Sequence, residues 1–172
     1  MCRVTTILSG PRLIVRRMSG DDLADFMAYQ GDPVVRRFLP GEPMDPARAA
    51  AYLTVQATLD DGVLDDWHGY AVEHRAEGRM IGDVGVWLPS RPEEIADVGF
   101  QFHPGFHGQG YAREAMELFL PYAFVTFHLR EVTATADVAN LPSRALMRRL
   151  GMHLIAESDR EVRYGLSREV AP

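Results

Sequence analysis

The sequence predicts one α/β (α+β) domain over residues 1–172. Three observations predict it: strand-like segments follow one another in mid-chain, a glycine-rich loop joins the last of them to an amphipathic helix, and a strand–helix–strand pattern comes after. A chain of 172 residues with 47% hydrophobic residues is large enough for one core, while two full domains would need more chain. A repeat, a low-complexity tract or a linker would divide the chain, and we find none of them.

The first third of the chain predicts one strand and three helices. The alternating, β-branched run from Arg12 to Arg17 is typical of a strand, and Ser19 or Asp21 can cap a helix over 22–29. Asp45 followed by a proline is a start signal for a longer helix. The two further helices are expected over 34–38 and 45–59.

The middle of the chain predicts an antiparallel meander followed by a helix. Strand-like runs cover 67–73, 80–88 and 95–102, and turn residues separate them. After the glycine-rich loop, apolar residues recur at helical spacing. These residues are Ala112, Ala115, Met116, Phe119 and Ala123.

The last third predicts a strand over 132–137, a helix, and two closing strands over 154–157 and 161–166. Asn140 is a favoured first cap of the helix, and Gly151 is suited to its end.

Composition narrows the class of protein. A net charge of −6 argues against a nucleic-acid or anionic-membrane surface, because both need a concentrated basic face. The single cysteine, Cys2, excludes an intrachain disulfide and favours a reducing cytoplasm. No run of about 18 apolar residues suggests a membrane span. His103 and His107 do not predict a metal site, because Pro104 and Gly105 prevent the helix that would bring them onto one face.

The loop from His103 to Ala112 carries the clearest chemistry. Free N–H groups and the positive end of the helix dipole converge where a helix begins, which suits phosphate oxygens. Gly108 and Gly110 let an anion approach the backbone. A phosphate-binding P-loop would need Gly-Lys-Ser/Thr, and a dinucleotide fingerprint would need a glycine where Arg113 stands, so both fail. A plain tight connection before a helix is the remaining structural alternative.

This loop resembles the pyrophosphate loop of GNAT acetyltransferases, whose pattern is Gln/Arg-x-x-Gly-x-Gly/Ala. The longer run reads HPGFHGQGYAREA and is similar to the branch that includes ribosomal-protein N-terminal acetyltransferases. The opening RLIVRRM and the closing NLPSRALMRRLGM resemble the same branch. The three matches occur in order and cover most of the chain.

The resemblance implies the GNAT fold, a mixed, mostly antiparallel, splayed sheet of about six or seven strands with helices on both faces. It implies that backbone groups around Gln101, Phe102 and His103 bind the pantetheine arm of acetyl-coenzyme A. Arg113 is a candidate for the 3′-phosphate. The resemblance assigns the pyrophosphate to the loop residues His107, Gly108, Gln109, Gly110, Tyr111 and Ala112.

The resemblance also implies roles at the thioester. Asp97 occupies a position where this branch commonly has an acid, which makes it the candidate proton acceptor for an attacking amine; an acid that merely pairs near a strand end is the alternative. Many GNAT enzymes donate a proton to the thiolate from a tyrosine, but Met147 stands there. Ser143 is the substitute, and Asn140 could bind pantetheine. Ser143 can instead be a local helix cap. Asn140 can cap the helix and also bind pantetheine, because the two roles are compatible.

Taken together, these residues predict an acetyl-coenzyme A-dependent N-acetyltransferase that uses direct attack in a ternary complex and needs no metal. The expected acceptor is a primary amine: a peptide or ribosomal-protein amino terminus, or a small amine such as an aminoglycoside or polyamine. The alternative is an acyl-coenzyme A sensor without turnover. The sequence is compatible with a homodimer.

Overall fold

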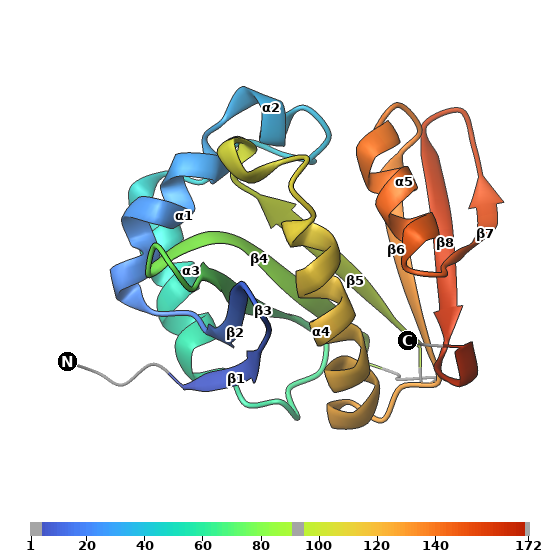
Figure 1. Ribbon diagram of the computed structural model, residues 1–172, viewed down its shortest axis with the longest axis horizontal. Coiled ribbons are helices and arrows are strands. Elements are labelled where there is room, and N and C mark those ends of the chain that lie inside the picture. The colour runs from blue at the N-terminus through green and yellow to red at the C-terminus, as the bar shows by residue number, and fades with distance from the viewer. Residues whose placement is uncertain (1–4, 91–94, 171–172) are drawn as a thin grey trace.

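Eight strands form one sheet in the order β1-β2-β3-β4-β5-β6-β8-β7. The computed structural model describes residues 5–90 and 95–170 (Figure 1). The strands are β1 (Thr6–Ser9), β2 (Leu13–Arg17), β3 (Asp66–His74), β4 (Arg79–Leu88), β5 (Ile95–Phe102), β6 (Glu131–Asp137), β7 (His153–Glu157) and β8 (Glu161–Ser167). The α-helices are α1 (Leu23–Gln30), α2 (Pro33–Arg36), α3 (Pro46–Thr58), α4 (Tyr111–Thr126) and α5 (Leu141–Arg149).

The fold class predicted from the sequence is confirmed, with one strand more than the six or seven expected. The additional strand is β1, a four-residue edge strand with no buried residue. It is held by antiparallel pairing with β2. Its own residues show no core-facing alternation, so hydrophobic periodicity could not reveal it.

Local signals placed the helix starts correctly. The Asp45 side chain accepts a hydrogen bond from the N–H of Arg48, with proline at the first helical position of α3. Ser19 and Asp22 form a capping box on a short 3-10 turn, Gly20–Asp22, that leads into α1. Such caps satisfy N–H groups that a helix cannot satisfy internally, which is why sequence alone marks them.

The sheet divides where β5 meets β6. These two strands are parallel and pair over three rungs, the last of which joins Asp97 to Thr133. Beyond that rung β6 continues along β8 as far as Asp137, while β5 continues along β4 as far as Phe102. The two halves of the sheet therefore diverge, as Figure 1 shows between the green and orange strands.

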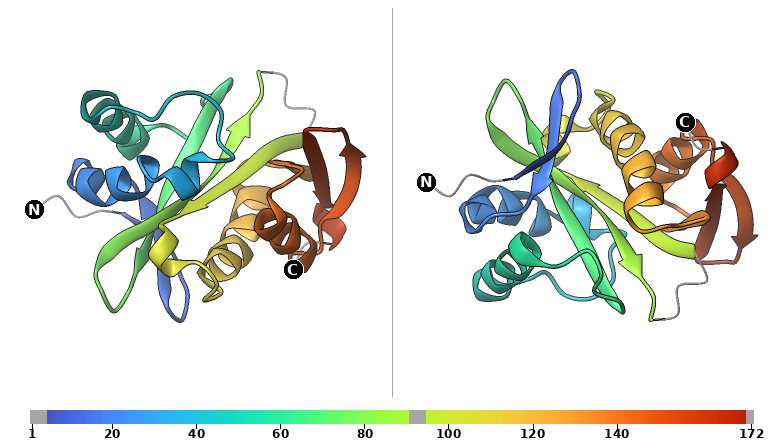
Figure 2. Two further views of the ribbon diagram at one scale, coloured as in Figure 1. Left: turned by 90° about the horizontal axis from the view of Figure 1, so that it is seen from above. Right: turned by 90° about the horizontal axis from the view of Figure 1, so that it is seen from below.

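Helices cover both faces of the sheet (Figure 2). Helices α4 and α5 pack on one face and enclose the larger core, in which Phe119, Leu120 and Met147 are buried. Helices α1 and α3 pack on the other face over a smaller core that includes Phe26 and Leu53. Full burial of each large apolar side chain stabilises the fold by roughly 1.5–3 kcal/mol. Each of the two cores therefore contributes to holding its own helices against the sheet.

Candidate functional site

The loop that joins β5 to α4 lies at the end where β5 and β6 have separated, and two of its glycines have left-handed backbone angles. After a 3-10 turn over Pro104–Phe106, Gly108 has φ +71° and Gly110 has φ +82°. A Cβ on Gly108 would meet nothing within 4 Å, so the backbone conformation rather than crowding favours glycine there. Because Gly110 is the N-cap of α4 and has no side chain, the first-turn N–H groups remain open to an anion.

Arg12, which is distant from this loop in sequence, contacts it through its side chain. Its Nη1 donates to the Gln109 carbonyl at 2.9 Å, and its Nε donates to Glu114 Oε2 at 2.7 Å. Its guanidinium also lies 4.3 Å from the centre of the Tyr111 ring. A groove of about 470 Å³ runs beside these residues. This role of Arg12 could not be predicted from the sequence, because its partners lie about a hundred residues away along the chain.

The two loop histidines make local hydrogen bonds. His107 Nε2 lies 2.7 Å from the carbonyl oxygen of Phe102, so the ring nitrogen donates to that carbonyl. His103 Nδ1 accepts from the N–H of Gly105 at 3.0 Å, and the His103 N–H donates to Ile81 O at 2.8 Å. Both side chains therefore shape the loop.

The backbone of β5 presents alternate residues to the open side. Because His103 donates to Ile81, the alternation of antiparallel pairs turns the backbone polar groups of Gln101 and Gly99 toward β4. The same alternation turns those of Val98, Phe100 and Phe102 toward β6. The carbonyl of Phe102 is occupied by His107, which leaves the Phe102 N–H and both groups of Phe100 facing the opening.

Asp97 lies at the closed end of the divergence. Its Oδ1 accepts a hydrogen bond from Thr133 Oγ1 at 2.8 Å, across the last β5–β6 rung. Burial raises the pKa of Asp97, while the Thr133 hydrogen bond and the charge of Arg163 act in the opposite direction. The alternation of β5 places Asp97 on the same face as Gln101, four residues farther along.

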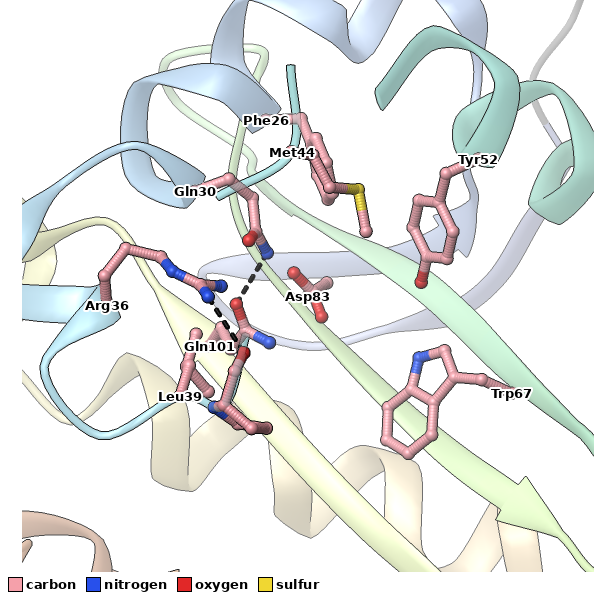
Figure 3. Close-up of a pocket in the computed structure, with 10 residues that line it drawn as sticks. Phe26, Gln30, Arg36, Leu39, Met44, Tyr52, Trp67, Asp83 and Gln101 are labelled. Carbon is pink, nitrogen blue, oxygen red and sulfur yellow. Dashed lines mark hydrogen bonds between the residues drawn. The ribbon is translucent and has the colours of Figure 1, made fainter. Parts of the chain in front are cut away.

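A cavity of about 300 Å³, which the sequence did not predict, lies on the α1/α3 face of the sheet (Figure 3). Its members come from six elements and the α2–α3 connection. They are Phe26, Gln30, Arg36, Leu39, Pro40, Met44, Tyr52, Trp67, Asp83 and Gln101.

Asp83 provides the carboxylate of this cavity. It is 4% exposed and accepts a hydrogen bond from the Tyr29 hydroxyl at 2.5 Å. Burial raises the pKa of Asp83 to about 7, although the Tyr29 hydrogen bond favours the charged form. One signal could have found it: Asp83 is the single acid in the otherwise apolar run from Met80 to Leu88.

Gln101 connects the cavity to β5. It is the cross-strand partner of Asp83, and its Oε1 accepts from Gln30 Nε2 at 2.6 Å. The indole of Trp67 lies two rungs farther along, over the Gly85–Gly99 pair, where a Cβ on Gly85 would come within 2.5 Å of the ring and one on Gly99 within 3.0 Å. The two glycines therefore let the indole lie against the sheet as one wall of the cavity.

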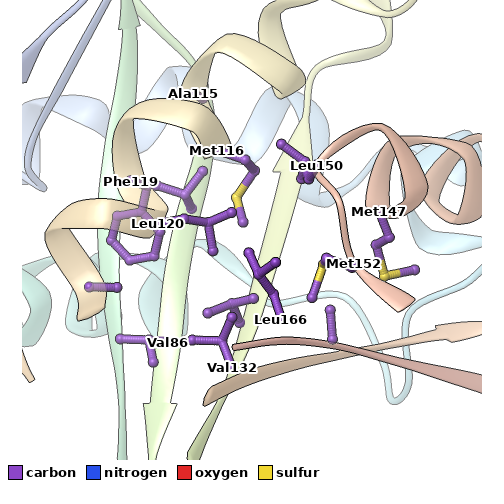
Figure 4. Close-up of a cluster of buried hydrophobic side chains, with 14 of the residues drawn as sticks. Val86, Ala115, Met116, Phe119, Leu120, Val132, Met147, Leu150, Met152 and Leu166 are labelled. Carbon is purple, nitrogen blue, oxygen red and sulfur yellow. The ribbon is translucent and has the colours of Figure 1, made fainter. Parts of the chain in front are cut away.

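Helix α5 carries the candidates from the closing motif. The Asn140 side chain accepts from the Ser143 N–H at 3.2 Å, so Asn140 is the N-cap. Arg144 donates to Val138 O at 2.9 Å. Met147 is 1% exposed and lies in the core (Figure 4). The structure thus places Asn140 and Ser143 together on the half of the sheet that faces β5 across the opening.

Arg113, the candidate for the 3′-phosphate, forms an ion pair with Glu117 at 2.7 Å on the exposed side of α4. Over residues 5–90 and 95–170, no group of three or more His, Cys, Asp or Glu side chains is arranged to hold a metal ion. Within the same ranges no helix is long and apolar enough to cross a membrane. Cys2 lies outside the described residues.

Comparison with known proteins agrees with this geometry. The chain is 33% identical to the FsC-acetyl coenzyme A-N(2)-transacetylase of Aspergillus fumigatus, over 95% of this chain and 79% of that protein. It is 27% identical to the uncharacterized N-acetyltransferase YnaD of Bacillus subtilis, over 82% and 79% of the two chains. RimL, a ribosomal alpha-N-protein acetyltransferase solved with coenzyme A, has a TM-score of 0.80 at 13% identity and covers 95% and 98%.

The model of the acetyltransferase (GNAT) domain family matches residues 12–153, from the arginine that holds the glycine loop to the first residue of β7. This range contains the diverging strands, the loop and α5. The chain therefore belongs to the GNAT acetyltransferase family.

Proposed function

We propose that the protein transfers an acetyl group from acetyl-coenzyme A to a primary amine by direct attack in a ternary complex. One observation carries the proposal: β5 and β6 part at the Asp97–Thr133 rung, and the opening leads to the uncapped first turn of α4. An extended arm can add to the free edge of β5 as a strand would, while its diphosphate reaches the helix N–H groups. The RimL neighbour, which is solved with coenzyme A, supports this use of the fold.

The coenzyme contacts follow from the backbone directions of β5. We assign the pantetheine arm to the backbone of Phe100 and to the N–H of Phe102, in place of the groups of Gln101 and His103, which face β4. His107 supports the arm indirectly through the Phe102 carbonyl. The pyrophosphate lies on the N–H groups of 108–112, and Arg113 exchanges Glu117 for the 3′-phosphate.

The Arg12→Ala variant tests whether Arg12 must order the glycine loop before acetyl-coenzyme A binds. The substitution removes the hydrogen bond to Gln109, the ion pair with Glu114 and the stacking on Tyr111. We expect the dissociation constant of acetyl-coenzyme A to rise about fivefold to tenfold, since ordering the loop then opposes binding by roughly 1 kcal/mol. Calorimetric titration measures it. An unchanged constant would show that the loop holds its shape without Arg12.

The acceptor follows from the charges around the cavity. Arg36 lines it, and its Nη2 donates to the carbonyl of Pro40 at 2.9 Å. Beyond the reacting nitrogen, the further ammonium groups of a polyamine would meet a like charge there, whereas a peptide amino terminus carries carbonyl oxygens that a guanidinium can bind. We therefore favour a peptide amino terminus, or a small amine that also carries oxygen acceptors. The similarity to RimL, an alpha-N-protein acetyltransferase, and to the Aspergillus N(2)-transacetylase supports nitrogen as the acceptor atom.

Ser143 is the proposed donor to the departing thiolate. In Ser143→Ala the backbone N–H that Asn140 accepts is retained, so the helix cap survives the substitution. We expect kcat to fall at least about tenfold while the affinity for acetyl-coenzyme A stays constant. Steady-state kinetics with a thiol-detecting reagent measure both. A kcat equal to that of the wild type would assign Ser143 to the helix end alone.

The function itself is tested by coenzyme release against a panel of amines and peptides, with the products identified by mass spectrometry. The chain contains no lysine, so acetylation of its own side-chain amines cannot obscure the products. Release with any amine excludes a pure sensor. Thermal stabilisation by acetyl-coenzyme A without release from any acceptor would support the sensor instead.

A further inference from the structure

We propose that the cavity between α1, α3 and the sheet receives the acceptor amine, and that Asp83 rather than Asp97 binds this amine and takes its proton. The inference rests on the proposed function and names the residue at which the acceptor is recognised. The alternative, Asp97, was predicted from its position in the sequence motif.

The lining of the cavity suits an ammonium group. Among the described residues that line it, Asp83 alone carries a carboxylate. The rings of Phe26, Tyr52 and Trp67 surround it, and Figure 3 shows Asp83 lying between the tyrosine and tryptophan on one side and Gln101 on the other. Aromatic faces attract cations, and a buried carboxylate gains most from a cationic partner.

The position of Asp83 also suits the reaction. Its cross-strand partner Gln101 belongs to the strand along which we place the pantetheine arm. An amine docked on Asp83 therefore lies one strand away from the proposed position of the coenzyme, on the α1/α3 face of the sheet.

Asp97 is placed less well for this task. It lies four rungs from the Asp83–Gln101 pair, on the far side of the Trp67 indole, at a spacing of about 13 Å along the strand. Its carboxylate is bound by Thr133 across the rung where the strands part, and it does not line the cavity. We assign Asp97 to fixing that rung.

The docked ammonium gives one proton to the Asp83 carboxylate, and the free amine forms a C–N bond to the thioester carbonyl carbon. The C–S bond then breaks, the Ser143 hydroxyl gives its proton to the thiolate and recovers the second nitrogen proton, and Asp83 returns its proton to solvent. The products are the N-acetyl amide, coenzyme A thiol and one proton.

The groups that face Asp83 come from three helices: Tyr29 on α1, Arg36 on α2 and Tyr52 on α3. Burial raises the pKa of both tyrosines, so they stay neutral near pH 7, and Arg36 is always charged. Asp83 is thus the group on this wall that titrates near neutrality, which matches a proton acceptor for an amine.

The test compares Asp83→Asn with Asp97→Asn, using one acceptor amine throughout. We expect Asp83→Asn to lower kcat/KM for the amine about 100-fold or more, with the dissociation constant of acetyl-coenzyme A unchanged. The proposal requires this loss to exceed that of Asp97→Asn at least tenfold. An equal or larger loss in Asp97→Asn overturns it. Asp159→Asn, in the β7–β8 turn, controls for loss of one negative charge.

Tyr29→Phe provides a readout that a structural role would not move. The Tyr29 hydrogen bond favours the charged form of Asp83, so its loss raises the pKa of Asp83. The acid limb of kcat/KM should move to higher pH in Tyr29→Phe, and activity at high pH should approach that of the wild type. An acid limb that stays in place overturns the proposal. Circular dichroism confirms that each variant is folded.

Failure of this inference is separable from failure of the proposed function. If the wild type releases no coenzyme with any amine, the proposed function fails, and the cavity is then tested by binding alone. Amine-dependent thermal stabilisation that disappears in Asp83→Asn supports the cavity as an amine site. Stabilisation that persists in Asp83→Asn refutes it. Turnover in the wild type with full activity in Asp83→Asn refutes the inference and leaves the proposed function intact.

Discussion

Replacing Gly110 with alanine is expected to weaken the binding of acetyl-coenzyme A by about 10- to 100-fold. Gly110 has φ +82°, a conformation that costs an L-residue roughly 1–2 kcal/mol. The loop relieves this strain by moving away from the geometry in which the α4 N–H groups converge. The new Cβ would lie 3.4 Å from Arg12 Nη2, so contact with neighbours adds little to the strain. Calorimetry on the folded variant measures the change.

Gly78 supplies the matched control. It has φ +61° in the turn between β3 and β4, and a Cβ there would meet nothing within 4 Å. Gly78→Ala introduces a similar backbone strain outside the glycine loop, so it should lower stability and leave coenzyme affinity unchanged. If both alanine variants bound the coenzyme as the wild type does, the N-terminus of α4 would not be the diphosphate site.

The Asp83→Asn variant should be more stable than the wild type at pH 8, by as much as about 4 kcal/mol. Burial raises the pKa of Asp83 from 3.8 to about 7, so between these values the folded protein holds a proton that the unfolded chain releases. The contribution of Asp83 therefore becomes less favourable as the pH rises through that window, and it is least favourable above pH 7. Asparagine does not ionise and avoids this penalty.

Denaturant titrations at pH 4.5 and pH 8 measure the difference. The gap between the two proteins should be small at the lower pH and large at the higher one, because a neutral Asp83 and an asparagine differ little in hydration. A gap independent of pH would mean that the carboxylate is not destabilised by burial. A residue whose replacement raises stability while abolishing activity is typical of a functional site.

The fold could be predicted to within one strand because its signals are local. Asp45, Asn140 and Gly151 act as caps within four residues of themselves, and strand alternation is visible in a short window. Strand β1 lacked such a signal. The divergence of β5 from β6 came from the family resemblance, because the pairing of distant strands is not encoded in any one segment.

The candidate site divides in the same way. The glycine loop was found because positive φ is required at particular positions. Asp83 and its cavity were missed because the lining residues come from six elements with no fixed spacing. His107 and Asn140, which the resemblance assigns to coenzyme contacts, each make a local hydrogen bond in the structure. Side chains near a loop or helix start satisfy their nearest backbone partners first.

Because β5 and β6 pair over only three rungs, the hydrogen bonding between these two strands is incomplete. A cosubstrate lying between the strands would pair with β5 in place of β6, supplying hydrogen-bond partners to main-chain groups that face the opening. Binding of the cosubstrate would then stabilise the C-terminal β6–β8 half against local opening. Amide hydrogen exchange in that half, followed with and without the cosubstrate, should be slower when the cosubstrate is bound.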